Sequence, residues 1–64
     1  MDYKELAKHQ AQSVNRIYNL VDELAFVGES TDLEYVSEAT KRIARAIEVE
    51  IEGMDEAVKE YHGI

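Results

Sequence analysis

The spacing of apolar residues constrains the fold of this chain more than any other feature. Two stretches, one before and one after Gly28, repeat their apolar positions at alternating intervals of four and three residues. Such heptad spacing keeps one side of an α-helix apolar and favours left-handed packing of helices at about 20°. The first row contains Tyr3, Ala7, Gln10, Val14, Ile17, Val21 and Leu24. The second row contains Val36, Thr40, Ile43, Ile47, Glu50, Met54, Ala57 and Tyr61. We therefore predict an all-α fold with two long helices.

Local signals mark the ends of these helices and the turn between them. Gly28 can adopt the left-handed conformation that closes a helix. Thr31 and Glu34 have the spacing of a capping box, so Thr31 is expected to cap the second helix. Asp2 and Glu5 form a similar start signal at the beginning of the chain.

These signals predict one domain, residues 1–64, that folds as an antiparallel helical hairpin. We expect the first helix at about residues 3–27, a turn at 28–31 and the second helix at about 32–61. Gly53 lies inside the second helix, and the apolar row continues beyond it. Gly53 is therefore expected to mark a close approach or a mild kink, and not a helix end.

Two polar residues, Gln10 and Glu50, interrupt the apolar rows. A hairpin folded at about residue 30 places them opposite each other, so they are predicted to share one buried polar layer that fixes register. In such a layer, with no cation evident, burial would raise the pKa of the Glu50 carboxyl. The alternative is that Glu50 turns to the edge and Ile51 takes its place. The same folding pairs Leu24 with Val36, Ile17 with Ile43, and Val14 with Ile47.

Further apolar residues flank both rows and cannot all be buried inside one hairpin. Beside the first row lie Leu6, Leu20 and Val27 on one side, and Ala11, Tyr18 and Ala25 on the other. Beside the second row lie Leu33, Ala44, Ile51 and Val58, with Ala39 and Ala46 opposite. A chain of 64 residues without cysteine lacks disulfides to compensate for a small core. We therefore expect a homodimer or a higher oligomer, most simply a four-helix bundle made of two hairpins.

In length, turn position and heptad pattern, the whole chain resembles the repressor-of-primer (Rop) proteins of plasmids. The resemblance implies a dimeric four-helix bundle. It also implies, as one alternative, that the protein modulates RNA by binding paired RNA loops.

Catalytic signatures are missing from the sequence. The inward-facing Glu-x-x-His pairs of di-iron bundles do not occur, and His9 and His62 lack the spacing of metal ligands. Both histidines are expected to be exposed and solvated. The sequence also has no Gly-rich phosphate loop and no cysteine nucleophile. We therefore predict that the protein is not an enzyme and uses no cofactor or metal.

Three surfaces are candidates for partner binding. The net charge of −7 argues against generic binding to polyanions, but residues 6–21 contain no acid. The outer face of the first helix therefore offers Lys4, Lys8, Gln12, Asn15, Arg16 and Asn19 as a partner-binding set. A second surface is the acidic row Glu48, Glu52, Asp55 and Glu56. A third is Phe26, which lies off its apolar row and is either covered by the loop or free to anchor a partner.

Together these patterns predict a small, non-enzymatic, homodimeric binding protein. It would act on a protein partner as a regulator, adaptor or inhibitor of bacterial, plasmid or phage type. The alternatives are a Rop-like RNA-binding modulator and a small-ligand (nucleotide) binder that uses the dimer seam. No apolar run is long enough to cross a membrane and no signal peptide is evident. A cytoplasmic location without membrane partners is therefore expected.

Overall fold

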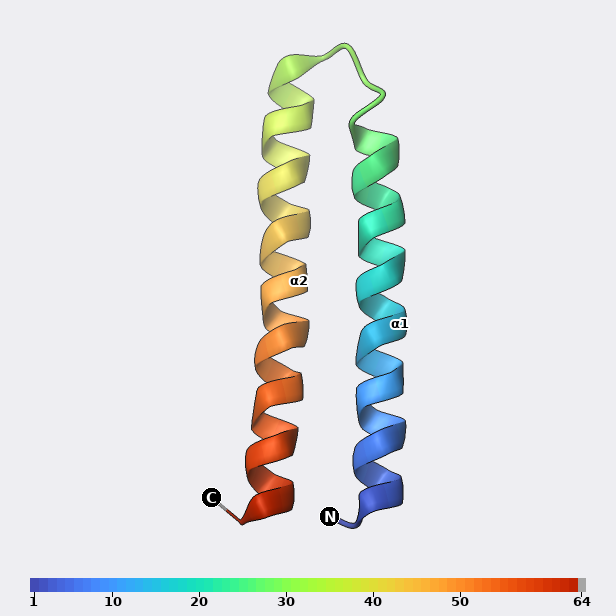
Figure 1. Ribbon diagram of the computed structural model, residues 1–64. Helices are drawn as coiled ribbons and strands as arrows, with labels where there is room; N and C mark the ends of the chain where they lie inside the picture. Colours follow the sequence, from blue (N-terminus) through green and yellow to red (C-terminus); the bar gives the residue numbers. More distant parts are fainter. Residues whose placement is uncertain (64) are drawn as a thin grey trace.

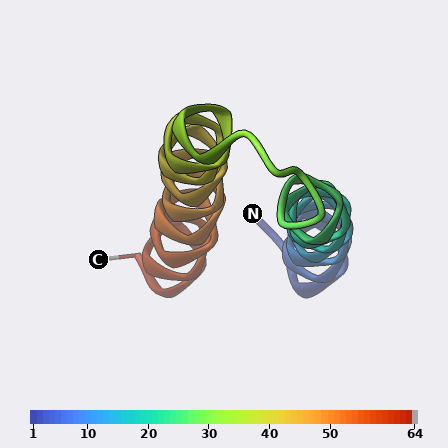
Figure 2. The ribbon, with the colours of Figure 1, turned by 90° about the horizontal axis from the view of Figure 1, so that it is seen from above.

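The computed structural model describes residues 1–63, which form two antiparallel helices joined by a short turn (Figure 1). Helix α1 spans Tyr3–Val27 and helix α2 spans Leu33–His62. The two helices pack along their lengths, and the start of α1 and the end of α2 lie opposite the turn (Figure 1). Viewed from the turn end, they form a single layer (Figure 2), with Cα extents of 47 × 18 × 7 Å. The predicted helical hairpin is confirmed.

Aspartates cap the first turn of both helices. The Asp2 carboxylate accepts a hydrogen bond from the Glu5 amide at 2.8 Å, as predicted. At α2, the Asp32 carboxylate accepts from the Tyr35 amide at 3.2 Å. The prediction that Thr31 caps α2 was wrong by one residue. Asp32 has an extended backbone, from which its short side chain reaches the amide three residues ahead.

The turn continues the winding of α1 beyond its last helical residue. Gly28 has φ −62°, a right-handed conformation, so the prediction of a left-handed glycine was wrong here. The amides of Glu29 and Ser30 donate to the carbonyls of Phe26 and Val27, which carries the helical path onward. The left-handed glycine is Gly63, with φ 72°, which follows α2.

The apolar core is small and lies in the half of the hairpin nearer the turn. Its buried members are Val27, Ala39 and Ile43. Leu20, Leu24, Val36 and Ile47 are partly buried and pack around them. Toward the chain ends, Ala57 is the buried apolar residue and Ser13 the buried polar residue among the residues described.

The register of the two helices differs from the predicted one by about one helical turn. Gln10 meets Met54 and Tyr3 meets Tyr61, so the numbers of facing residues sum to 64. The fold point therefore lies beyond residue 30, because the turn extends the winding of α1.

The row of α1 that faces α2 is also rotated from the predicted row. Val14 and Val21, which were expected to face α2, are exposed. Tyr3 is also exposed, although its ring lies against Tyr61 of α2. The observed inner row keeps the intervals of four and three and contains Leu6, Gln10, Ser13, Ile17, Leu20, Leu24 and Val27.

Helix α2 passes through Gly53 without ending, as predicted. A methyl group built at Gly53 would meet no neighbouring atom within 4 Å. Gly53 is therefore not a point of close approach within the hairpin, contrary to one of the two predicted roles.

Candidate functional site

Two broad faces flank the inner rows of the hairpin. The inner row of α1 is given above, and that of α2 includes Val36, Ala39, Ile43, Glu50 and Ala57. The first face, which we call the seam face, is built from two rows that contain no charged residue. These rows are Ala7, Ala11, Val14, Tyr18, Val21 and Ala25 on α1, and Thr40, Ala44, Ile47, Ile51, Met54 and Val58 on α2. Both rows keep alternating intervals of four and three residues. The seam face therefore carries a second heptad pattern beside the one that packs α1 against α2.

The seam face exposes large apolar side chains to solvent. Tyr18 is 66% exposed and Ile51 is 54% exposed. Between the helices, an apolar depression of about 320 Å³ is lined by Val14, Ile17, Tyr18, Val21 and Met54. A surface with this pattern is typical of a protein–protein interface.

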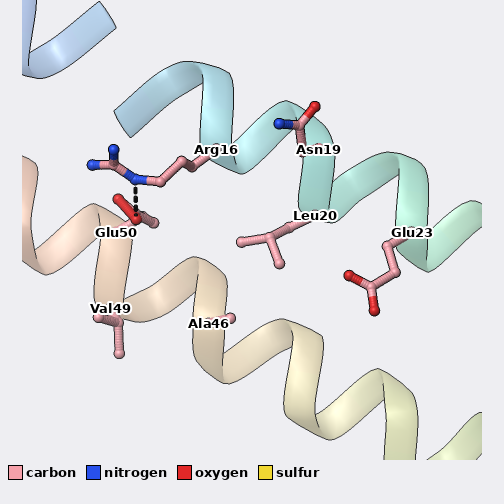
Figure 3. Close-up of a pocket in the computed structure, with 7 residues that line it drawn as sticks. All are labelled: Arg16, Asn19, Leu20, Glu23, Ala46, Val49 and Glu50. Atoms are coloured by element: carbon pink, nitrogen blue, oxygen red, sulfur yellow. Dashed lines mark hydrogen bonds and ion pairs between the residues drawn. The ribbon is translucent and has the colours of Figure 1, made fainter. Parts of the chain in front are cut away.

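The opposite side of the hairpin, which we call the groove face, carries two ion pairs that bridge the helices. Arg16 pairs with Glu50 at 2.5 Å, and Arg42 pairs with Glu23 at 3.4 Å. Between these pairs, Leu20 points toward α2 (Figure 3). The groove encloses about 450 Å³ and is lined by Arg16, Asn19, Leu20, Glu23, Ala46, Val49 and Glu50.

Glu50 is held at the groove by Arg16, which reaches across from α1 (Figure 3). The Arg16 hydrogen bond lowers the pKa of the Glu50 carboxyl, outweighing partial burial, which acts in the opposite direction. The charge of Arg16 and the Ser13 hydroxyl lower it further. The prediction of a raised pKa was therefore wrong, because the observed register brings Glu50 beside a cation. The same contact raises the pKa of Arg16.

Gln10 takes a partner other than Glu50. Its amide nitrogen donates to the Met54 carbonyl at 3.1 Å, and its amide oxygen is buried without a partner among residues 1–63. Both Gln10 and Glu50 are half-buried on the inner rows. In place of the predicted Gln10–Glu50 contact, Gln10 bonds to Met54 and Glu50 bonds to Arg16, in keeping with the shifted register.

Ser13 and His9 extend this polar region along α1. The Ser13 hydroxyl is buried and accepts a hydrogen bond from Arg16 at 3.2 Å. His9 is half-buried, and its Nδ1 atom lacks a partner in the described part of the chain. The expectation of an exposed His9 was therefore wrong, whereas His62 is exposed as predicted. Sequence reasoning missed Ser13 because it lies outside the predicted row.

All six residues of the predicted partner-binding set on α1 are exposed. They are Lys4, Lys8, Gln12, Asn15, Arg16 and Asn19. Arg16 and Asn19 line the groove, and Arg16 is already paired with Glu50. The set contains two further cations, Lys4 and Lys8.

The acidic row of α2 is also exposed, at Glu48, Glu52, Asp55 and Glu56. Within it, Asp55 pairs with Lys59 at 3.1 Å. Neither the acidic row nor the partner-binding set of α1 lines the apolar depression on the seam face. Both are therefore distinct from the apolar seam face.

Phe26 is 75% exposed, so the loop does not cover it. It lies at the rim of a hollow of about 330 Å³ that is also lined by Glu29, Ser30 and Tyr35. We call this the turn-end hollow. Sequence reasoning missed Tyr35, although this residue, like Phe26, lies outside the apolar rows.

Comparisons with protein-family models, with curated proteins and with solved structures found no match. The resemblance to the repressor-of-primer proteins therefore rests on architecture alone. Among the described residues, neither helix is apolar enough over sufficient length to cross a membrane. In the same part of the chain, no three His, Asp or Glu side chains are grouped so that they could hold a metal ion.

Proposed function

We propose that this protein is a non-enzymatic binding protein that dimerises through its seam face. Two hairpins would form a four-helix bundle, and the remaining surface would bind a protein partner. In this role the dimer would act as a regulator, adaptor or inhibitor. The observation that carries the proposal is the seam face itself, which is apolar, uncharged and uncovered in the hairpin.

The surface area of the hairpin supports the need for a second layer. Its accessible surface is 5035 Å². A compact monomer of the same mass exposes about 4,200 Å². The excess of roughly 800 Å² matches the area that each partner buries in an interface of standard size. Domains are normally built from at least two packed layers, and the hairpin supplies one.

The chemistry of the seam face favours a second copy of the same chain as its occupant. Each chain carries a net charge of −7, so a charged seam would repel its copy. Neither seam row contains a charged residue. Each row also mixes small residues such as Ala11 and Ala44 with large ones such as Tyr18 and Ile51. This mixture allows the side chains of two faces related by a two-fold axis to interdigitate.

The charge distribution favours a protein partner over RNA. Arg16, a central cation of the predicted partner-binding set, is engaged by Glu50. Net negative charge further opposes binding to phosphates, whose recognition depends on free Lys and Arg. Binding to a protein surface does not require free Lys and Arg side chains in this way, so a net negative charge does not oppose it.

Sedimentation equilibrium on a seam-face variant and a matched control tests the assembly. Tyr18→Glu with Ile51→Glu should abolish the dimer and greatly reduce helicity. The double substitution places two carboxylates from each chain, four in all, in the apolar interface of the dimer. Val49→Glu is the control, since Val49 is exposed on the groove face. It should leave the dimer intact. A wild-type chain that is folded and monomeric at 7.3 kDa would refute the proposal.

Binding assays at increasing salt distinguish the partner classes. The purified dimer is titrated with fluorescent structured RNA and, separately, with a nucleotide panel. We expect neither to bind. RNA binding that weakens steeply with salt would favour an RNA modulator instead. A thermal shift with a nucleotide would favour a ligand binder at the seam.

A further inference from the structure

We propose that the turn-end hollow binds an arginine side chain presented by the protein partner. This inference rests on the proposed function, that the chain acts by binding another protein. It adds the place of contact and the chemical nature of the partner's anchoring residue.

Aromatic side chains from both helices line the hollow. Phe26 comes from the last turn of α1 and Tyr35 from the first turn of α2. They are 75% and 48% exposed. The volume of about 330 Å³ is roughly that of ten water molecules, which is room for one long side chain. Faces of aromatic rings attract guanidinium and ammonium groups.

The electrostatic surroundings select a cation. Glu29 lines the hollow together with the rings, and it forms no ion pair within residues 1–63. The hollow lies within residues 22–38, which contain six carboxylates and neither Lys nor Arg. Arg42, from outside this segment, pairs with Glu23. An anionic partner would be repelled here, whereas a basic protein surface is complementary.

Arginine fits the combination of groups better than lysine. Its planar guanidinium can stack on an aromatic ring while its N–H groups donate to a carboxylate in two parallel hydrogen bonds. The Phe26 and Tyr35 rings supply the stacking surfaces, and Glu29 supplies the acceptor. A lysine ammonium would make the ion pair without the planar stacking.

The hollow lies on the side of the hairpin that the proposed dimer leaves open. Phe26 follows Asn19 by seven residues, and Tyr35 precedes Arg42 by seven, so each shares a side of its helix with its counterpart. Asn19 lines the groove, and Arg42 makes one of the bridging ion pairs. A second copy on the seam face would therefore leave the turn-end hollow accessible.

NMR titration of the intact protein with three short peptides tests this proposal. Each acetylated peptide carries two arginines, two lysines or two citrullines between glycines. The arginine peptide should shift the amide signals of Phe26, Glu29 and Tyr35 most. The lysine peptide should bind more weakly. The citrulline peptide, which has nearly the shape of arginine without its charge, should not bind measurably.

Matched variants show whether the response comes from the hollow. Phe26→Ala and Glu29→Gln should each weaken binding of the arginine peptide by about two- to fivefold. Glu52→Gln removes the same charge from the acidic row, and Val49→Ala trims an exposed apolar residue elsewhere on the groove face. Both control variants should bind the peptide as the wild type does.

Two results would overturn the inference. One is equal binding of the arginine and citrulline peptides. The other is a response spread along the acidic row that Phe26→Ala does not change. Sedimentation of the same samples separates this failure from that of the proposed function. A dimer that does not bind the arginine peptide selectively would refute only the arginine site at the turn-end hollow. A folded monomer would refute the proposed dimer.

Discussion

At the scale of single residues, the Arg16–Glu50 pair explains how a carboxylate occupies the inner row of α2. The Glu50 side chain is only 20% exposed, and an unpaired carboxylate at such a position would be costly. Arg16 reaches across the groove and donates to it, while its own side chain remains half exposed. The polar residue on the apolar row is therefore tolerated because a cation from the other helix satisfies it.

This pair predicts a defined pH dependence of stability. The folded-state pKa of Glu50 lies below its ordinary value of 4.5, so folding favours the ionised carboxylate. The resulting stabilisation is present above the ordinary pKa and is lost as pH falls through the lower folded-state pKa. Glu50→Gln should therefore lower the melting temperature at pH 7 and have little effect at pH 2.

Thermal melts of wild type and Glu50→Gln across this pH range measure the effect. Glu48→Gln, on the exposed acidic row, is the matched control and should give little difference at either pH. A Glu50→Gln protein that melts above the wild type at pH 7 would contradict the ion pair. It would instead support the buried layer that the sequence suggested.

The partner of Glu50 was not predictable from the sequence, because it depends on register. A fold point at residue 30 places Gln10 opposite Glu50, whereas the observed turn brings Arg16 within reach. The offset of about one helical turn, together with the rotation of α1, places Gln10 beside Met54 and Arg16 beside Glu50. Phe26 could be identified, since a large aromatic outside the rows is already unusual in the sequence.

At the scale of the elements, the sequence predicted both helices to within one or two residues. The rotation of α1 about its axis could not be predicted, because two overlapping heptad rows share Gln10, Ile17 and Leu24. Leu20 and Val27 complete one row, and it is this row that faces α2. The remaining residues of the other row include Ala7, Val14 and Val21, which lie on the seam face. Which row faces α2 is decided by the turn and by packing across the hairpin, and heptad spacing alone does not encode it.

Gly53 supplies a prediction for α2. A helical glycine away from close neighbours costs stability through backbone entropy, and an added methyl group meets nothing within 4 Å. Gly53→Ala should therefore stabilise the protein by about 0.5–1 kcal/mol. Urea unfolding, followed by circular dichroism, measures the change.

Gly63→Ala is the matched control, because Gly63 has φ 72°. An alanine there is strained, so this substitution should not stabilise the protein. Loss of stability in Gly53→Ala would mean that the backbone at this position is approached closely in the assembled protein.

At the scale of the whole molecule, folding and association are expected to be linked. If two hairpins complete one core, the melting temperature should rise with protein concentration. The charge of −7 on each chain opposes association, and salt screens that repulsion across an uncharged seam. Raising sodium chloride from about 0.02 to 0.5 M should therefore strengthen the dimer. Sedimentation at both salt concentrations measures this, and weaker association at high salt would indicate ion pairs across the interface.

The uneven placement of the buried side chains has a consequence for how the hairpin opens. Val27, Ala39 and Ile43 lie toward the turn, while the far half relies on Ala57 and on polar and aromatic contacts. Local opening therefore requires least free energy at the end of the hairpin away from the turn and most near the turn. The helices are expected to separate from that end toward the turn. Refolding would close in the reverse order, because contacts beside a short turn join residues that are near in sequence. The segment that closes first is the one that carries Phe26 and Tyr35.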